Sequence, residues 1–192
     1  MTDLIYGKAY NSRGEYGSRE NGNITKAYDT WNSMVTRCYS YKYQSRQPTY
    51  IGCTVAEAWL DFQNFAKWFY GHDYSNLGYH LDKDLLIPNN KIYSPETCCF
   101  VPSSLNNLLT NRKSKRGAYP QGVCLKKATG RFSARLMVDG KKKNLGYFDC
   151  PNEAHQAYKV AKEKYVKEKA LEWRDRIAPN VFDALMSWQL TE

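Results

Sequence analysis

The sequence predicts an α+β protein: a helical N-terminal region, a short strand-and-helix unit, then a three-stranded antiparallel sheet packed on a helix. Three observations predict this fold class. Apolar residues recur at helical spacing over residues 27–70. Short alternating segments bounded by turn residues follow at 80–93 and again at 122–148. The length of 192 residues suits one large domain or two small ones.

Composition limits the protein classes. A hydrophobic content of 42% with 16 tyrosines and 5 tryptophans is enough for a folded core, which argues against wholesale disorder. No apolar run approaches the roughly 20 residues of a membrane span, and the N-terminus lacks the apolar region of a signal peptide. We therefore expect a soluble, cytoplasmic protein with no membrane partner, whose six cysteines are mostly reduced thiols.

The net charge of +9 is concentrated in one third of the chain. Residues 112–143 contain eleven Lys or Arg and one acid, Asp139, so this stretch carries +10 and the remainder sums to −1. Such concentration points to a polyanion partner. The alternative is a solvated basic surface kept for solubility.

The N-terminal part reads as an arm followed by two helices. Residues 1–26 are rich in Gly, Asn, Ser and Arg, which predicts a loosely ordered arm with a short strand at 4–6. Apolar spacing predicts a helix over 27–39, then a loop to residue 50, then a helix over 55–70. Thr54 and Glu57 would form a capping box for the second helix, worth about 1 kcal/mol.

A central stretch carries the residues with catalytic chemistry. His80, Asp82 and Asp84 alternate, so they can share one face of a strand. The turn at 88–90 reverses the chain, residues 92–93 can run back, and a second turn leads to a helix that starts at Ser103 or Ser104. That helix would carry the carboxamides of Asn106 and Asn107 and end near residue 111.

This stretch resembles a known family. Leu81-Asp82, the six residues from Tyr93 to Cys98, and the helical Asn106-Asn107 are similar to the ββα-metal core of HNH endonucleases, in the variant of phage homing-type enzymes. The region before the core, with Trp31, Arg37, Trp59 and Phe62 among its matching residues, resembles the same phage proteins. The resemblance covers about residues 28–112.

The resemblance implies an endonuclease that hydrolyses phosphodiester bonds in double-stranded DNA with one divalent ion, Mg²⁺ or Mn²⁺, inside the infected bacterial cell. Asp82 matches the metal-binding acid of the strand, and Asn106 or Asn107 the helical metal ligand. Asn107 is also assigned to the catalytic set.

The chain departs from the family at the general base. The histidine that should follow the strand acid is replaced by Lys83, and the asparagine that orients the base by Thr97. We assign His80 as the substitute base, because imidazole suits that task near neutral pH, and Asp84 as a second acidic group. The alternative is an HNH scaffold that binds DNA, or interacts with another protein, without cutting.

Four cysteines precede or flank this core: Cys38, Cys53, Cys98 and Cys99. Their spacings are wide and contain no Cys-x-x-Cys, so buried, unreactive thiols are favoured over a structural zinc site.

Alternating segments predict three strands at 122–126, 131–138 and 142–148, with Thr129-Gly130 and Asp139-Gly140 at the turns. A helix should begin near Pro151 and cover one face of the sheet with a stripe of Ala and Tyr residues. Phe132, Ala134 and Leu136 would face that helix, so Arg131 and Arg135 would share the opposite face.

This second unit is similar to the Apetala-type (ethylene-response-factor) DNA-binding domain over about residues 118–165. The similarity rests on Gly122-Val123, on the segments 130–135 and 145–149, and on Ala154, Ala157 and Tyr158. Departures at Cys124, Phe132 and Asn144 bear on base contacts. The resemblance implies that the sheet docks in the major groove.

The predicted DNA contacts come from the linker and the sheet. They are Arg112, Lys113, Lys115, Arg116, Lys126, Lys127, Arg131, Arg135, Lys141, Lys142 and Lys143. The two sheet arginines would read guanine edges, and the lysines would meet phosphates. RNA is an alternative partner, because a basic, aromatic-rich surface does not choose between nucleic acids.

The expected segments are an arm (1–26), an HNH-like nuclease domain (27–111), a basic linker (112–118), an Apetala-type domain (119–170) and a helical tail (171–192). The tail should pack back on the protein; partner binding, for example to a host protein, is the alternative.

Overall fold

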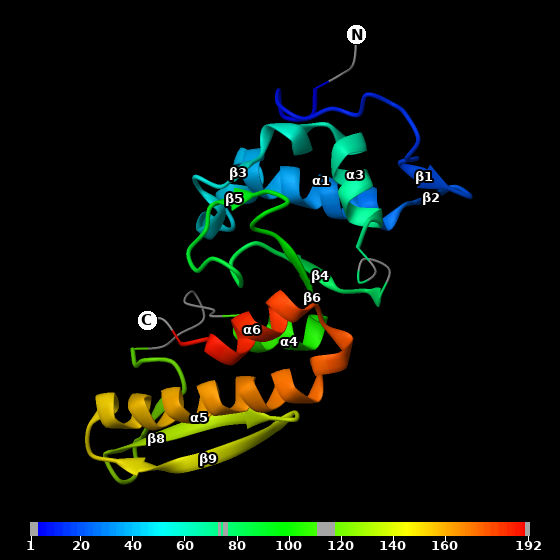
Figure 1. Ribbon diagram of the computed structural model, residues 1–192. Coiled ribbons are helices and arrows are strands. Elements are labelled where there is room, and N and C mark those ends of the chain that lie inside the picture. The colour runs from blue at the N-terminus through cyan, green and yellow to red at the C-terminus, as the bar shows by residue number, and fades with distance from the viewer. Residues whose placement is uncertain (1–3, 73, 75–76, 111–117, 191–192) are drawn as a thin grey trace. The chain divides into compact units, whose positions relative to one another are not determined.

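The computed structural model describes residues 4–72, 74, 77–110 and 118–190 (Figure 1). The chain forms two compact units, Met1–Ser103 and Ser104–Glu192. Both helices and strands are present, and the second unit holds a three-stranded antiparallel sheet, so the predicted mixed α+β class is confirmed. Within the described ranges, no helix combines the length and the apolar character that crossing a membrane requires.

Two helices form the centre of the first unit. Helix α1 spans Lys26–Tyr39, as predicted, and Thr25 caps it by accepting a hydrogen bond from the Tyr28 N–H. Helix α3 spans Phe62–Tyr70. The two helices pack through fully buried aromatic residues, and the Trp31 indole donates to the Trp59 carbonyl at 2.7 Å. Burial of a Trp is tolerated here because its N–H has this partner.

The prediction of a single helix over 55–70 is wrong. The segment divides into strand β3 (Thr54–Val55), a 3₁₀ helix (Glu57–Leu60) and α3. Asp61, not Thr54, is the N-cap of α3, because its carboxylate accepts from the Gln63 N–H at 3.1 Å. The Thr54 N–H instead donates to Lys91 in a parallel pairing with β5 (Ile92–Tyr93). The loop after α1 also contains short helices, α2 (Tyr41–Gln44) and a 3₁₀ turn (Pro48–Tyr50).

The N-terminal segment differs from the expected loosely ordered arm. From residue 4 on it makes a β-bridge between Ile5 and Ala9 in place of the predicted strand, and a hairpin of β1 (Arg19–Glu20) and β2 (Asn23–Ile24). Tyr10 pairs with the chain at Asp61, whose carboxylate also accepts from the Ser12 N–H at 3.1 Å. These contacts hold the segment on the N-terminus of α3.

The central stretch forms a strand pair followed by a helix, but not with the predicted strands. Strand β4 (His80–Asp82) pairs antiparallel with β6 (Cys99–Val101), and α4 (Ser103–Leu109) begins two residues later. The expected return strand at 92–93 is therefore wrong as a partner of β4, since that segment is β5 and pairs with β3. Side chains of the intervening loop direct this path: Asn90 donates to the Lys83 and Ile92 carbonyls.

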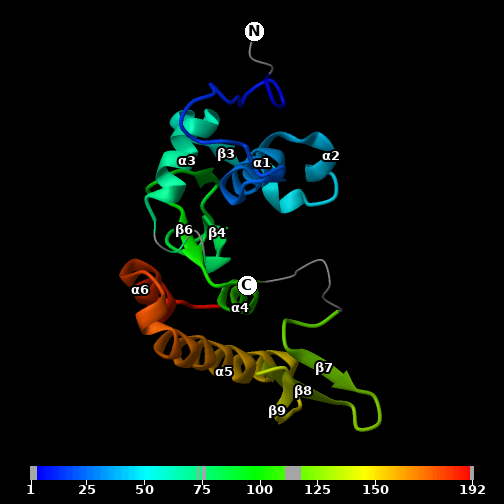
Figure 2. The same ribbon diagram turned by 90° about the vertical axis from the view of Figure 1, so that its right-hand side faces the viewer.

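The second unit has the predicted sheet and helix. Strands β7 (Val123–Lys126), β8 (Arg131–Val138) and β9 (Lys141–Phe148) pair in sequence order, and α5 (Pro151–Glu172) lies across one face (Figures 1 and 2). Beyond a 3₁₀ turn (Arg174–Arg176), α6 (Pro179–Ser187) packs on α5, and Leu190 joins the core of the sheet and helix. The prediction that the tail packs back on the protein is confirmed.

Candidate active site and nucleic-acid interface

Strand β4 carries the first candidate site. Leu81 is buried and lies opposite Phe100, whereas His80 is exposed and Asp82 is half-buried. The alternation places His80 and Asp82 on the same side of the strand, as predicted. The His80 Nε2 lies 3.2 Å from the Ser103 hydroxyl, so the imidazole is anchored at the start of α4.

The Asp82 carboxylate also shapes the turn after β4. Its Oδ1 accepts hydrogen bonds from the backbone N–H groups of Asp84 (2.8 Å) and Leu85 (2.7 Å). Burial raises the pKa of Asp82 above its usual range, and these two hydrogen bonds oppose the shift by favouring the anion. Asp82 thus has a structural role whether or not it binds a metal.

Asp84 lies outside β4 and does not share its face, so the prediction that it does is wrong. Its carboxylate is paired with the buried Lys83 ammonium at 2.5 Å, and that ammonium also donates to the Asn90 carbonyl at 2.7 Å. Lys83 lies 5.7 Å from the centre of the Tyr93 ring. These contacts turn the Lys83 ammonium toward the loop, so Lys83 does not take the place of the missing histidine.

Asn106 and Asn107 lie on α4, where they are half-buried and exposed, respectively. Both belong to the second unit, and Asp82 to the first. Their approach to Asp82 around a metal ion therefore stays a prediction. Across the described ranges, no group of three or more His, Cys, Asp or Glu residues could hold a metal ion. A site of one aspartate and one asparagine is smaller than such a group.

The four cysteines of the first unit, Cys38, Cys53, Cys98 and Cys99, are all buried and free, as predicted for unreactive thiols. Burial raises the pKa of Cys38 and of Cys98 to about 12. Both groups are therefore protonated at neutral pH, and a protonated thiol is a poor nucleophile and a poor metal ligand.

The second candidate site is the sheet surface opposite α5, which we call the open face. Phe132, Ala134 and Leu136 face α5, as predicted. Alternation and strand register place the following residues on the open face: Cys124, Lys126, Arg131, Ser133, Arg135, Met137, Lys142, Asn144 and Tyr147. Four of these nine carry positive charge and none is acidic.

The two arginines of the open face differ in whether they are held in an ion pair. The Arg131 guanidinium is paired with Asp149 at 2.8 Å and donates to the Tyr147 carbonyl at 3.0 Å. Arg135 is exposed and makes no ion pair with any residue in the described part of the chain. Arg135 is therefore the arginine that can reach a ligand without first breaking an ion pair.

Strand alternation separates the three consecutive lysines of β9, and a bulge lies farther along the strand, between Asn144 and Gly146. The register shifts at Ala134/Arg135, so Lys142 lies opposite Met137 on the open face. Lys141 and Lys143 lie opposite Val138 and Leu136, on the side of the sheet that α5 covers. The prediction treated the three lysines alike, and the structure places only Lys142 on the open face.

The open face also includes residues that are not among the predicted DNA contacts. Tyr147 and Met137 add exposed apolar surface to the open face, and the Lys126 ammonium lies 4.8 Å from the centre of the Tyr147 ring. Strand alternation with Arg135 was the signal that could have found them. Lys127 lies in the turn after β7. Arg112, Lys113, Lys115 and Arg116 lie outside the described residues.

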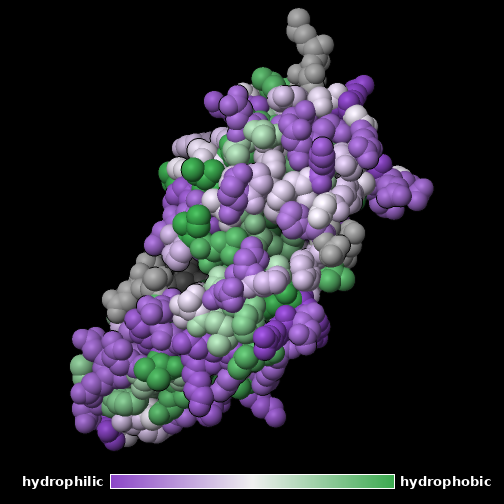
Figure 3. All heavy atoms as spheres, in the orientation of Figure 1, coloured by the Kyte–Doolittle hydropathy of each residue, from purple (hydrophilic) through white to green (hydrophobic). Residues whose placement is uncertain are grey.

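No family model, curated protein or solved structure matches this chain. The side-chain geometry of each unit therefore carries the functional argument. Where Figure 1 shows α5, β8 and β9, the surface in Figure 3 is mainly hydrophilic, with isolated hydrophobic side chains.

Proposed function

We propose that the chain is a metal-dependent DNA endonuclease of the phage HNH homing type, in which the second unit binds double-stranded DNA through the open face. The observation that carries DNA binding is the charge of that face, which has four basic side chains, of which Arg131 is paired with Asp149. Such a surface attracts the phosphate backbone. Arg135 and the exposed Met137 offer a guanidinium for a guanine edge and an apolar contact for a thymine methyl.

For cleavage, His80 and Asp82 share a side of β4, which supports the proposed base and metal ligand. A divalent ion would supply charge stabilisation at the scissile phosphate. His80 would accept the proton of the attacking water, and Asp82 with Asn106 or Asn107 would hold the ion.

A second candidate function is a DNA-binding protein that does not cut. Two observations favour it: Lys83 occupies the position of the usual base and is bound to Asp84, and Asp82 is engaged by two backbone N–H groups. In this alternative the strand pair serves only as a scaffold.

DNA binding should depend on Arg135 and Lys142 more than on their neighbours. We expect Arg135→Ala to weaken binding of duplex DNA about tenfold, because a guanidinium contact to a base is worth roughly 1–3 kcal/mol. Lys142→Ala should lower the slope of log affinity against log salt by about 1, and Lys141→Ala should change it less. Fluorescence anisotropy at several KCl concentrations measures both effects.

Lys141→Ala is the matched control, since it removes the same charge one residue away, on the side of the sheet nearer α5. Equal salt slopes for Lys141→Ala and Lys142→Ala would contradict the open face as the docking surface. Tighter binding to an RNA of the same sequence than to the DNA duplex would favour the RNA alternative.

Cleavage should require the charge of Asp82. In Asp82→Asn the new side chain keeps an oxygen for the Asp84 and Leu85 N–H groups, so the turn is preserved while the anion is lost. We expect loss of Mg²⁺- or Mn²⁺-dependent cutting of supercoiled DNA, and a loss of about 10²-fold or more for His80→Ala.

Asp84→Asn is the matched control, because Asp84 is an acid off the strand, and it should keep most of the activity. If the wild-type protein binds DNA but no divalent metal ion supports cutting, the non-cutting function is correct. If His80→Ala cuts at the wild-type rate, the base is another group.

A further inference from the structure

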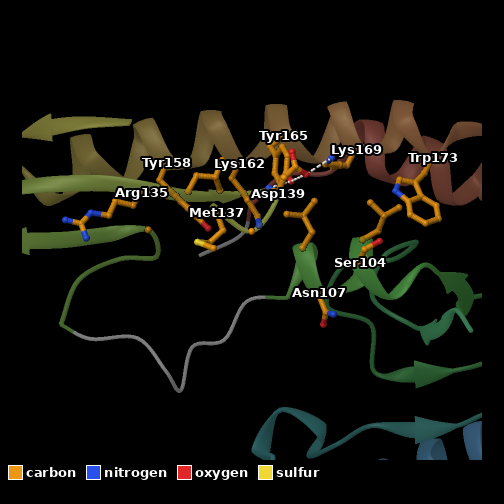
Figure 4. A pocket seen from close by; sticks show the side chains of 15 residues that line it. Ser104, Asn107, Arg135, Met137, Asp139, Tyr158, Lys162, Tyr165, Lys169 and Trp173 are labelled. Carbon is orange, nitrogen blue, oxygen red and sulfur yellow. Dashed lines mark hydrogen bonds and ion pairs between the residues drawn. The ribbon is translucent and has the colours of Figure 1, made fainter. Parts of the chain in front are cut away.

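The second unit contains a cavity of about 650 Å³, and Arg135 and Met137 of the open face are among the residues at its edge. One wall is formed by four residues of α5 and by its C-cap: Tyr158, Lys162, Tyr165, Lys169 and Trp173. Figure 4 shows these residues on the side of α5 that faces α4. Leu105 and Leu108 of α4 line it from the opposite side. Strand β8 lines it beyond Ala134, where β7 no longer pairs with it.

Lys162 is the unusual residue of this wall. Its exposed fraction is 7%, and its ammonium makes no hydrogen bond or ion pair with any residue that the structure describes. A buried charge without a counter-charge is costly. Burial alone lowers the pKa of Lys162 to about 8, so most of the lysine is still charged at pH 7.

The acid of this wall, Asp139, already has an ion-pair partner and a hydrogen-bond partner. The Asp139 carboxylate pairs with Lys169 at 2.8 Å and accepts from the Tyr165 hydroxyl at 3.0 Å. Lys169 also pairs with Glu172 at 2.8 Å. Among the described residues, these pairings leave two lining cations without an ion pair, Lys162 and Arg135, and of the two only Lys162 is buried.

We propose that this cavity binds a small aromatic carboxylate, with the carboxylate on the Lys162 ammonium and the ring among Tyr158, Tyr165 and Trp173. The cavity volume falls in the range of small-molecule sites, which are mainly apolar with a few polar anchors. Leu105, Leu108 and Met137 complete an apolar lining that suits the ring. The carboxylate supplies the charge that Lys162 lacks.

The probe for the test is 2-naphthoate, with neutral 2-naphthamide as its matched control, titrated calorimetrically into the full chain without DNA. We expect 1:1 binding of 2-naphthoate with a dissociation constant of about 10 to 500 μM. This range follows from the binding free energy per non-hydrogen atom that is usual for a ligand of this size. Lys162→Met should weaken 2-naphthoate at least tenfold and leave the weaker binding of 2-naphthamide unchanged.

Two further variants make the result specific. Lys164→Met removes an exposed lysine of the same helix and should not alter binding. Leu108→Trp should fill the cavity and abolish binding while leaving Lys162 in place. Failure of 2-naphthoate to bind, or equal affinity for the wild type and Lys162→Met, would overturn the proposal. Neither readout involves DNA, so both are independent of the proposed nuclease.

Discussion

Replacing Gly122 by alanine should destabilise the second unit by about 3 kcal/mol, from a left-handed backbone that costs about 1–2 kcal/mol and overpacking that costs about 1–3 kcal/mol. Gly122 has φ +80°, and a Cβ there would overlap the ring of Tyr158. That ring cannot yield easily, because it is 5% exposed and belongs to the core between the sheet and α5. Urea unfolding followed by circular dichroism measures the loss.

Gly130→Ala is the matched control. Gly130 has φ +70°, yet a Cβ there would meet nothing within 4 Å, so only the backbone cost of about 1–2 kcal/mol applies. Equal losses in the two variants would show that the Tyr158 ring moves aside. A larger loss for Gly122→Ala would explain physically why glycine precedes Val123 at the start of β7.

Replacing Lys162 by methionine should stabilise the second unit by about 3 kcal/mol at pH 7. The folded-state pKa of about 8 lies below the ordinary lysine value of 10.5, so folding disfavours the charged form. This difference corresponds to roughly 3 kcal/mol. Methionine fills a similar volume in the apolar wall without a charge.

The stabilisation by Lys162→Met should depend on pH in a direction that follows from the lowered pKa of Lys162. Between pH 8 and 10.5 the unfolded chain binds more protons at this position than the folded chain, so wild-type stability rises with pH. Below pH 8 both states are protonated and the full penalty is present. The advantage of Lys162→Met should therefore shrink steadily from pH 8 to pH 10.5.

Urea unfolding of the wild type and of Lys162→Met at several pH values tests this prediction. The difference between their free energies of unfolding isolates Lys162, because the contributions of all groups that titrate alike in both proteins cancel. Lys164→Met is the control, and its difference from the wild type should stay near zero at every pH, since Lys164 is exposed. A stabilisation by Lys162→Met that does not vary with pH would mean that packing, not charge, is responsible.

The second unit was largely predictable because its signals are local. Alternation along β8 separates Phe132 and Ala134 from Arg131 and Arg135, and Asp139-Gly140 adopts the positive φ angles that a tight hairpin turn requires. Pro151 at the first turn of α5 set the helix start. Each of these features depends on residues within a few positions of one another.

The candidate sites were only partly predictable. The β4 alternation correctly placed His80 and Asp82 together, but the chain path that makes β6 the partner of β4 depends on hydrogen bonds from Asn90 across the loop. Lys162 is spaced four residues from Tyr158, and this spacing could have placed it on the apolar stripe. Its lack of a counter-charge becomes visible only when the cavity is formed.

The sequence by itself determined the mixed α+β class, the basic sheet, the helix that covers it and the shared face of His80 and Asp82, because propensity and periodicity act over short stretches. Only the tertiary structure decided that Asp61 begins α3, that Lys142 rather than Lys141 or Lys143 lies on the open face, and that Lys162 is buried with no ion pair among the described residues. Each of these outcomes depends on contacts between distant segments, where the cost of burial and the demand for hydrogen-bond partners override local preference.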